Sequence, residues 1–117
     1  MRKISKTIAN AFNRGLTASV GNTRTDGQSV WLHGNKIAWR QNGNRLALTL
    51  ANWPTVTTRE RLNAILYVEG FDFQFKQVNH QQVLSRPSVD GSRFRALTNL
   101  KDTQIVTFKQ GASYDNI

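Results

Sequence analysis

The chain has 117 residues, which suits a single domain spanning 1–117 with a modest hydrophobic core. Its 16 lysines and arginines against 7 acidic residues give a formal net charge of +9. This excess indicates a polyanionic partner, most often nucleic acid, although a basic surface can also serve solubility alone. The sequence has no cysteine and no stretch of about 18 apolar residues, which excludes a disulfide framework, a thiolate metal site and a membrane-spanning helix.

Residues 2–14 are predicted to form a short amphipathic helix. Ile4, Ile8 and Phe12 recur at helical spacing, and Gly15 follows where a C-terminal cap belongs. Targeting segments and membrane-surface helices can have a similar composition, but the narrow apolar stripe is more simply explained by docking on a sheet. The basic residues of this helix are Arg2, Lys3, Lys6 and Arg14.

Residues 29–50 are predicted to form a three-stranded antiparallel meander, because turn-forming pairs separate alternating apolar segments. Gly34-Asn35 and Asn42-Gly43 adopt positive φ readily, so each is predicted to make a two-residue hairpin turn. A three-residue second turn is the alternative. It would pair Trp39 with Ala47 and mix the two sides of the sheet, so the two-residue turn is preferred.

This register sorts the meander into an apolar side and a basic side, since side chains alternate across a strand. Trp39 is therefore predicted to be buried and Trp31 exposed, while Trp53 is expected to plug the end of the sheet. The apolar side holds Val30, Leu32, Ile37, Trp39, Leu46, Leu48 and Leu50. The basic side holds Trp31, His33, Lys36, Ala38, Arg40, Arg45, Ala47 and Thr49.

A central helix is predicted over about residues 58–67. Thr57 with Glu60 three residues later fits a capping box. An apolar stripe on this helix would cover the apolar side of the meander. Arg59 and Arg61 are expected to be solvated or paired with neighbouring glutamates. The stripe consists of Thr58, Leu62, Ile65 and Leu66.

The C-terminal half is predicted to add further strands. Residues 71–78 place three phenylalanines on one side of a half-buried strand, and Asn79-His80 turns into a short strand around 82–84. The segment 86–117 is less regular, with a last strand at 104–109. Further features of this segment are the turn signal Asp90-Gly91 and the Arg93-Phe94-Arg95 run.

These elements together predict an α+β fold. Its core is the meander packed against the central helix over residues 29–66, with an N-terminal helix in residues 1–15 and C-terminal strands beyond. The sequence lacks paired catalytic carboxylates, a phosphate-binding glycine loop and a nucleophile motif, so neither an enzyme nor a cofactor is predicted. His33 and His80 lack zinc-ligand spacing, and His33 is expected to be solvated.

The basic side of the meander is the candidate nucleic-acid-binding surface. A positively charged surface with an aromatic ring suits single-stranded nucleic acid, because cations neutralise phosphates while bases stack on the ring. Trp31 is the predicted ring. Simple solvation of this side, or coverage by another segment, is the alternative. The predicted phosphate contacts are Arg24 from a loop at 20–28, Lys36, Arg40 and Arg45, extended by Lys3, Lys6 and Arg14 of the N-terminal helix.

Three short motifs lie in the centre of the chain: LHGNKIA from Leu32, ANW from Ala51 and TTRERLN from Thr57. They resemble a core that recurs in small tailed-phage proteins, with the form LHGNxIA, then GW or NW, then TTRxRLN. The likeness covers about residues 30–66, and Asn52 stands where a glycine is common. The chain is also similar to the single-stranded-DNA-binding RNA polymerase cofactor of lytic Pseudomonas podoviruses. That resemblance implies binding to melted promoter DNA and recruitment of a phage RNA polymerase in the host cell cytoplasm.

Two functions of different classes remain open. The first is a non-enzymatic single-stranded DNA-binding protein of a phage, acting in transcription or replication. The second is a phage protein that binds and modulates a host protein, and binding to double-stranded nucleic acid without sequence preference is a further alternative. A homo-oligomer is compatible with each. The salt dependence of affinity separates nucleic-acid binding from protein binding. Affinity for a single strand falls with a log–log slope of about −0.7 per phosphate contact, whereas affinity for a protein partner changes far less with salt.

Overall fold

The computed structural model describes residues 1–88, 93–109 and 113–116 of the chain. Its helices and strands are α1 (Lys3–Asn13), β1 (Ala18–Val20), β2 (Thr23–Thr25), β3 (Ser29–Leu32), β4 (Asn35–Gln41), β5 (Arg45–Thr49), α2 (Val56–Glu69), β6 (Gln74–Val78), β7 (Gln81–Pro87), β8 (Phe94–Asn99), β9 (Ile105–Lys109) and β10 (Ser113–Asn116). The predicted α+β class is confirmed.

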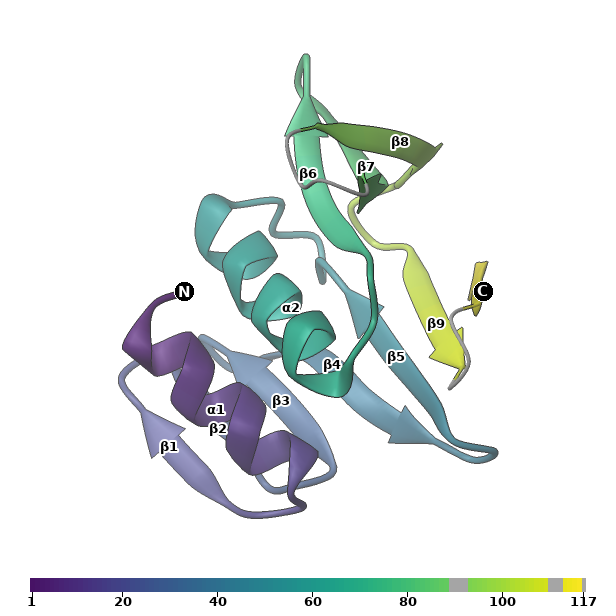
Figure 1. Ribbon diagram of the computed structural model, residues 1–117. Coiled ribbons are helices and arrows are strands. Elements are labelled where there is room, and N and C mark those ends of the chain that lie inside the picture. The colour runs from purple at the N-terminus through teal and green to yellow at the C-terminus, as the bar shows by residue number, and fades with distance from the viewer. Residues whose placement is uncertain (89–92, 110–112, 117) are drawn as a thin grey trace.

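The strands form two antiparallel sheets, and the helices cover one of them on a single face. The larger sheet has the order β1-β2-β3-β4-β5-β9-β10, and the smaller has the order β6-β7-β8. α1 lies over β2 and β3, and α2 lies over β4 (Figure 1). We call the covered side of the larger sheet the helix face and the opposite side the open face.

One hydrophobic cluster joins the helices to the helix face. Ile8 and Phe12 of α1 and Leu62 and Leu66 of α2 are each at most 1% exposed. Full burial of a side chain of this kind stabilises the fold by roughly 1.5–3 kcal/mol. The apolar stripes predicted for the two helices are thus confirmed. The sheet contributes Val30, Ile37, Leu46, Leu48, Val106 and Phe108 to the same cluster.

The first hairpin turn lies one residue earlier than predicted. His33-Gly34 forms the two-residue loop, with φ of 51° and 80°, and Trp31 consequently pairs with Lys36. The register then shifts between Trp31 and Val30, so that Val30 pairs with Ala38 and not with a tryptophan. An irregularity of this kind places one extra residue in one of the two strands. The pairs beyond it are therefore displaced by one residue from those of a regular register.

The second hairpin has the three-residue loop that the sequence analysis set aside. Asn42-Gly43-Asn44 connects β4 to β5, and its last two residues have φ of 76° and 59°. Left-handed residues at the end of a three-residue loop are the usual way to close such a hairpin. Trp39 therefore pairs with Ala47, and Arg40 pairs with Leu46.

This register exchanges side chains between the two faces. Trp39 was predicted to lie in the core, but it stands on the open face and is only partly buried. Arg40 and Ala38 were predicted on the basic side, but they lie on the helix face, where Ala38 is fully buried. Leu46 and Leu48 keep their predicted core positions, so the core survives the change of register.

Two predicted boundaries also differ. Residues 20–28 were predicted as a loop, but the chain forms a β1-β2 hairpin there, because Thr23 and Thr25 are buried on the helix face. The central helix begins earlier than predicted. Thr55 is its N-cap, and the Thr55 hydroxyl accepts a hydrogen bond of 3.1 Å from the backbone N–H of Thr58.

The C-terminal strands follow the prediction in part, since the strand predicted over 71–78 begins only at Gln74 and no strand was predicted at β8. Phe73 and Phe75 are buried, and Asn79-His80 forms the turn between β6 and β7 with φ of 50° and 65°. β7 and β9 occupy the predicted positions. The turn predicted at Asp90-Gly91 lies outside the described residues.

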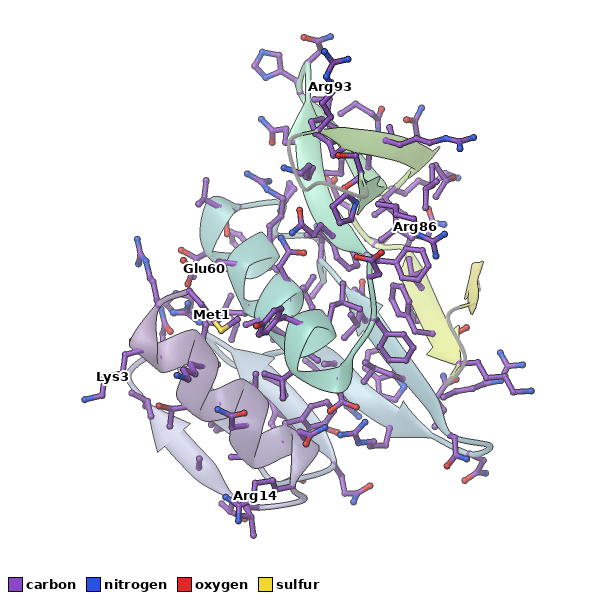
Figure 2. All side chains as sticks on the ribbon, viewed as in Figure 1. Met1, Lys3, Arg14, Glu60, Arg86 and Arg93 are labelled. Atoms are coloured by element: carbon purple, nitrogen blue, oxygen red, sulfur yellow. The ribbon has the colours of Figure 1, made fainter. Side chains whose placement is uncertain are left out.

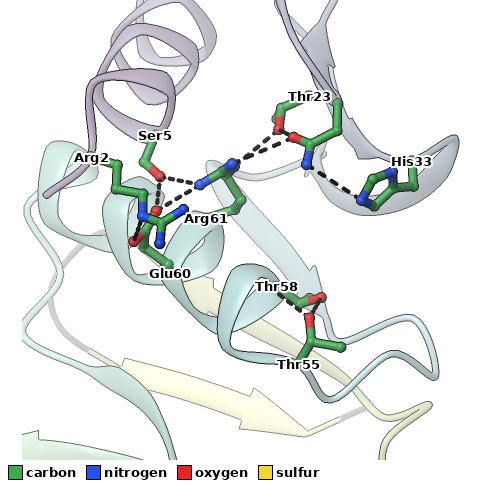
Figure 3. A network of polar contacts seen from close by, with 9 residues as sticks. Arg2, Ser5, Thr23, His33, Thr55, Thr58, Glu60 and Arg61 are labelled. Carbon is green, nitrogen blue, oxygen red and sulfur yellow. Dashed lines mark hydrogen bonds and ion pairs between the residues drawn. The ribbon is translucent and has the colours of Figure 1, made fainter.

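A buried arginine ties both helices to the sheet. Arg61 of α2, predicted to be solvated or paired with a neighbouring glutamate, is 3% exposed and is paired with Glu60. Its guanidinium donates to Ser5 Oγ at 2.7 Å, Glu60 Oε1 at 2.6 Å and Thr23 Oγ1 at 3.0 Å (Figure 3). Arg2 contacts the other oxygen of the same glutamate at 3.2 Å. Ser5 and Thr23 belong to remote parts of the chain, so helical spacing alone could not reveal them as partners.

Two further polar residues of α2 fix the smaller sheet. Arg59 Nη1 donates to the Pro54 carbonyl and to Gln82 Oε1, both at 3.0 Å. Asn63 donates to the Phe75 carbonyl at 3.0 Å and accepts from the Phe75 N–H at 2.6 Å. The TTRERLN segment thus holds α2 against the elements on both sides of it.

We expect Arg61→Ala to lower the free energy of unfolding by about 3 kcal/mol or more, because it removes the cation from a buried polar network. Arg2→Ala is the matched control. It removes a 70% exposed side chain from the same carboxylate and should cost less than about 1 kcal/mol. Urea denaturation followed by circular dichroism measures both. Equal losses in the two variants would contradict the role given to the buried guanidinium.

Candidate nucleic-acid interface

The exposed part of the open face carries two tryptophans, each beside a cation. Arg24 of β2 and Lys36 of β4 are the cross-strand partners of Trp31 in β3. The guanidinium carbon of Arg24 lies 4.0 Å from the Trp31 ring centroid, and Lys36 Nζ lies 5.3 Å from the Trp39 ring centroid. We call these four residues the tryptophan face. Cation–π contacts of this kind contribute about 0.5–1 kcal/mol at exposed sites and hold charge and ring together.

The tryptophan face is confined to β2, β3 and β4. Ala47 of β5 and its partner Thr107 of β9 are 0% and 1% exposed, so the same side of the sheet is closed beyond Trp39. Arg45 is the first residue of β5 and is half-buried. Its side chain alternates with that of Leu46, so it lies on the open face, at the margin of the tryptophan face. The surface that remains is a short platform on one half of the sheet.

A shallow hollow of about 250 Å³ adjoins this platform. It lies between the β1-β2 turn and the β3-β4 turn, and Arg24, Trp31 and His33 line it. His33 Nε2 lies 3.3 Å from Asn22 Nδ2, which connects the two turns. His33 is exposed, as predicted, although it belongs to the turn and not to a strand.

Arg40 is engaged within the fold on the helix face. Its two terminal nitrogens donate to both oxygens of Glu69, at 2.6 and 2.8 Å, and one also donates to the Phe12 carbonyl at 3.2 Å. Burial raises the pKa of Glu69, but hydrogen bonds from Arg40 and Asn13 outweigh this effect and hold that pKa below its ordinary value of 4.5. The pair closes the ends of α1 and α2 onto β4.

The cations of α1 point away from the sheet. Lys3, Lys6 and Arg14 are exposed, and Lys3 and Arg14 project outward near opposite ends of the helix (Figure 2). Because α1 covers the helix face, these three charges and the tryptophan face lie on opposite sides of the sheet. They do not form the continuous track with Trp31 that the sequence predicted.

The structure thus brings Arg24, Trp31 and Lys36 together as predicted, with Arg45 at the margin. Trp39 is the member that sequence reasoning missed, because the two-residue turn assigned it to the core. The signal was present in Asn42-Gly43-Asn44, which also fits a three-residue loop.

A model of the family described as the Kyanoviridae Gp96 protein matches residues 1–112. The chain belongs to this family. The tailed-phage origin predicted from the central motifs is confirmed by this match. No curated protein and no solved structure matches the chain. The family match covers nearly the whole of this Gp96-family protein.

Within residues 1–88, 93–109 and 113–116, the part of the chain that the structure describes, no group of three or more His, Cys, Asp or Glu side chains is arranged to hold a metal ion. No helix there is long and apolar enough to cross a membrane.

The Arg40–Glu69 pair predicts a pH dependence of stability. The folded-state pKa of Glu69 is lowered, so its contribution is complete above 4.5 and is lost as the pH falls through the folded-state pKa. We expect Glu69→Gln to lower the free energy of unfolding by roughly 1–3 kcal/mol near neutral pH, and this deficit to shrink on acidification. Urea titrations across the acid range measure it, with the exposed Asp72→Asn as the charge control. A deficit that does not change with pH would contradict the ion-pair explanation.

Proposed function

We propose that this Gp96-family phage protein is a non-enzymatic single-stranded DNA-binding protein that uses the tryptophan face. The observation that supports this is the placement of two half-buried indole rings and two exposed cations on one side of the sheet. Bases stack on the rings, and phosphates meet the neighbouring charges. Such stacking contributes about 1–3 kcal/mol per base and tolerates any base, because every base has a π-face.

The surface suits an unpaired strand better than a duplex. In a duplex the faces of the bases are stacked on one another and are not accessible to side chains on a sheet. Both helices pack on the opposite side of the sheet, so neither adjoins the tryptophan face as a groove-reading helix (Figure 1). Arg24 over Trp31 does not block stacking, since a guanidinium plane also stacks on bases.

Charge supports the same partner class. The net charge of +9 attracts any polyanion and speeds its association. A duplex can contact the cations of α1 through its phosphates alone, so Lys3, Lys6 and Arg14 are the residues that double-stranded binding would use. The two surfaces lie on opposite sides of the sheet, which makes them separable by mutation.

A second candidate function, binding to a protein partner, is favoured by a groove on another side of the molecule. This groove has a volume of about 550 Å³ and lies between α2 and β6. Val56, Tyr67 and Phe94 line it and are 70%, 75% and 43% exposed. Clustered exposed apolar groups mark interaction sites. Recruitment of a phage RNA polymerase, or modulation of a host protein, is the role that we assign to this groove.

The charge contribution is tested by replacing Arg24 and Lys36 together with glutamine. Two phosphate contacts should be lost, so the salt slope for a single-stranded oligonucleotide should fall in magnitude by about 1.4. Lys3→Gln with Lys6→Gln removes the same charge from α1 and should leave the slope nearly unchanged. Fluorescence anisotropy at several salt concentrations, with duplex competitor, provides the measurement. A larger effect of the α1 variant would move the site to α1 and favour a duplex.

The stacking contribution is tested by Trp31→Ala and Trp39→Ala. Each should weaken single-strand binding by about 1–3 kcal/mol with the salt slope preserved, because stacking releases no counterions. Tyr67→Ala removes an exposed ring from the α2–β6 groove and is the matched control. If Tyr67→Ala weakens DNA binding while both tryptophan variants bind like the parent protein, the tryptophan face is not the site.

A further inference from the structure

A pocket of about 420 Å³ lies where the β3-β4 hairpin meets the start of α2. Its apolar lining comes from the buried side chains of Leu32, Ile37 and Leu50 and from Trp53. The volume lies within the range of about 300–1,000 Å³ that is typical of small-ligand sites. This pocket is distinct from both the tryptophan face and the groove beside Tyr67.

The loop that carries Trp53 is held in place by its backbone. Ala51 and Asn52 have φ of 53° and 66°, and the Asn52 N–H donates to the Asp102 carbonyl at 2.8 Å. The Trp53 N–H donates to the Leu50 carbonyl at 2.9 Å. Trp53 was expected to plug the end of the sheet, but its side chain is 57% exposed. The fold thus presents a large ring at the mouth of an apolar pocket without burying it.

Polar groups stand among the apolar ones. The pocket is also lined by Asn35, the first residue of β4, and by Thr57 in the first turn of α2. A carboxamide offers both a donor and an acceptor, and a hydroxyl can act as either. A flat ring with hydrogen-bonding groups along its edge matches this lining. An aliphatic side chain would fill the space but leave these polar groups without partners.

His33 connects the pocket to the tryptophan face. It lines the pocket beside Trp53 and also the hollow beside Trp31. A strand that stacks on Trp31 can therefore continue around the β3-β4 turn and reach Trp53. Arg24 and Lys36 place positive charge at this end of the sheet, where the phosphates of such a strand would pass.

We infer that this pocket receives one unstacked nucleobase of the bound strand, seated against Trp53. The inference rests on the proposed function, since the strand supplies the base. It adds a site that discriminates between bases. The pocket contacts the edge of the base, whereas the rings of the tryptophan face contact only the flat side of a base.

The first experiment uses free nucleosides, which carry no phosphate and so make no charge contact with Arg24 or Lys36. Stacking on the tryptophan face would shift the Trp31 and Trp39 signals, whereas entry into the pocket would shift the Trp53 signal. The indole N–H signals of the full-length protein are followed by NMR during titration with each of the four deoxynucleosides. We expect the Trp53 signal to shift in a saturable way with at least one of them. No shift would overturn the inference. A shift at least as large with N-acetyl-phenylalaninamide would also overturn it, by showing that the pocket takes an amino-acid side chain.

The second experiment uses oligonucleotides in which a single abasic site is moved along the strand. For the parent protein, loss of one particular base should weaken binding by roughly 5- to 150-fold, the equivalent of one stacked base. In Trp53→Ala that position should lose its importance, while Trp53→Phe should restore it. Leu16→Ala, which removes an exposed apolar side chain outside the pocket, is the matched control and should behave like the parent.

The outcomes separate this inference from the proposed function. If Trp31→Ala and Trp39→Ala weaken binding but Trp53→Ala does not, the tryptophan face is supported and the base pocket is rejected. If only Trp53→Ala weakens binding, the pocket is supported and the tryptophan face is rejected.

Discussion

The arrangement of the whole helix layer depends on the burial of one charged side chain. A buried guanidinium is unfavourable unless its N–H groups are paired, and the partners of Arg61 come from α1, α2 and β2. The network is therefore complete only when all three elements are in place. The apolar core supplies most of the stabilising free energy but is not directional. The hydrogen bonds of Arg61 fix the orientation of the two helices on the sheet, and the Arg40–Glu69 pair does the same at the opposite ends of the helices.

Within the described residues, this construction commits some cations to the fold and leaves others on the surface. Arg40, Arg59 and Arg61 are held by carboxylates, carbonyls and amides within the fold and are committed to its structure. Arg24 and Lys36 lie over indole rings on the surface, where a phosphate can still approach them. Net charge therefore predicts the class of partner but not the residues that meet it. The position of each cation relative to the sheet decides that.

The sequence predicted the two helices and the three strands of the meander well and the strand register poorly, for one physical reason. Helical spacing and turn residues are local, so Ile8, Phe12 and Leu62 could be assigned to the core correctly. Register depends on turn length, and a shift of one residue moves every side chain to the other face. Asn42-Gly43-Asn44 supports two turn lengths, and the carboxylate that favours the observed one lies 29 residues from Arg40, in Glu69. The same choice hid Trp39, whereas Arg24, Trp31 and Lys36 lie before the second turn, on β2, β3 and the start of β4, and were found.

The platform on β2 to β4 is also the part of the sheet that α1 supports from behind. Ile8 and Phe12 pack against its reverse side, so a ligand cannot easily displace the strands around Trp31. A rigid surface loses little conformational entropy on binding, and most of the ordering then falls on the flexible strand. A strand that must follow a fixed surface is steered by the shape of that surface. His33 lines both the hollow beside Trp31 and the pocket beside Trp53, so in the binding mode that we propose the step from stacking any base to selecting one lies at this turn and not on the sheet.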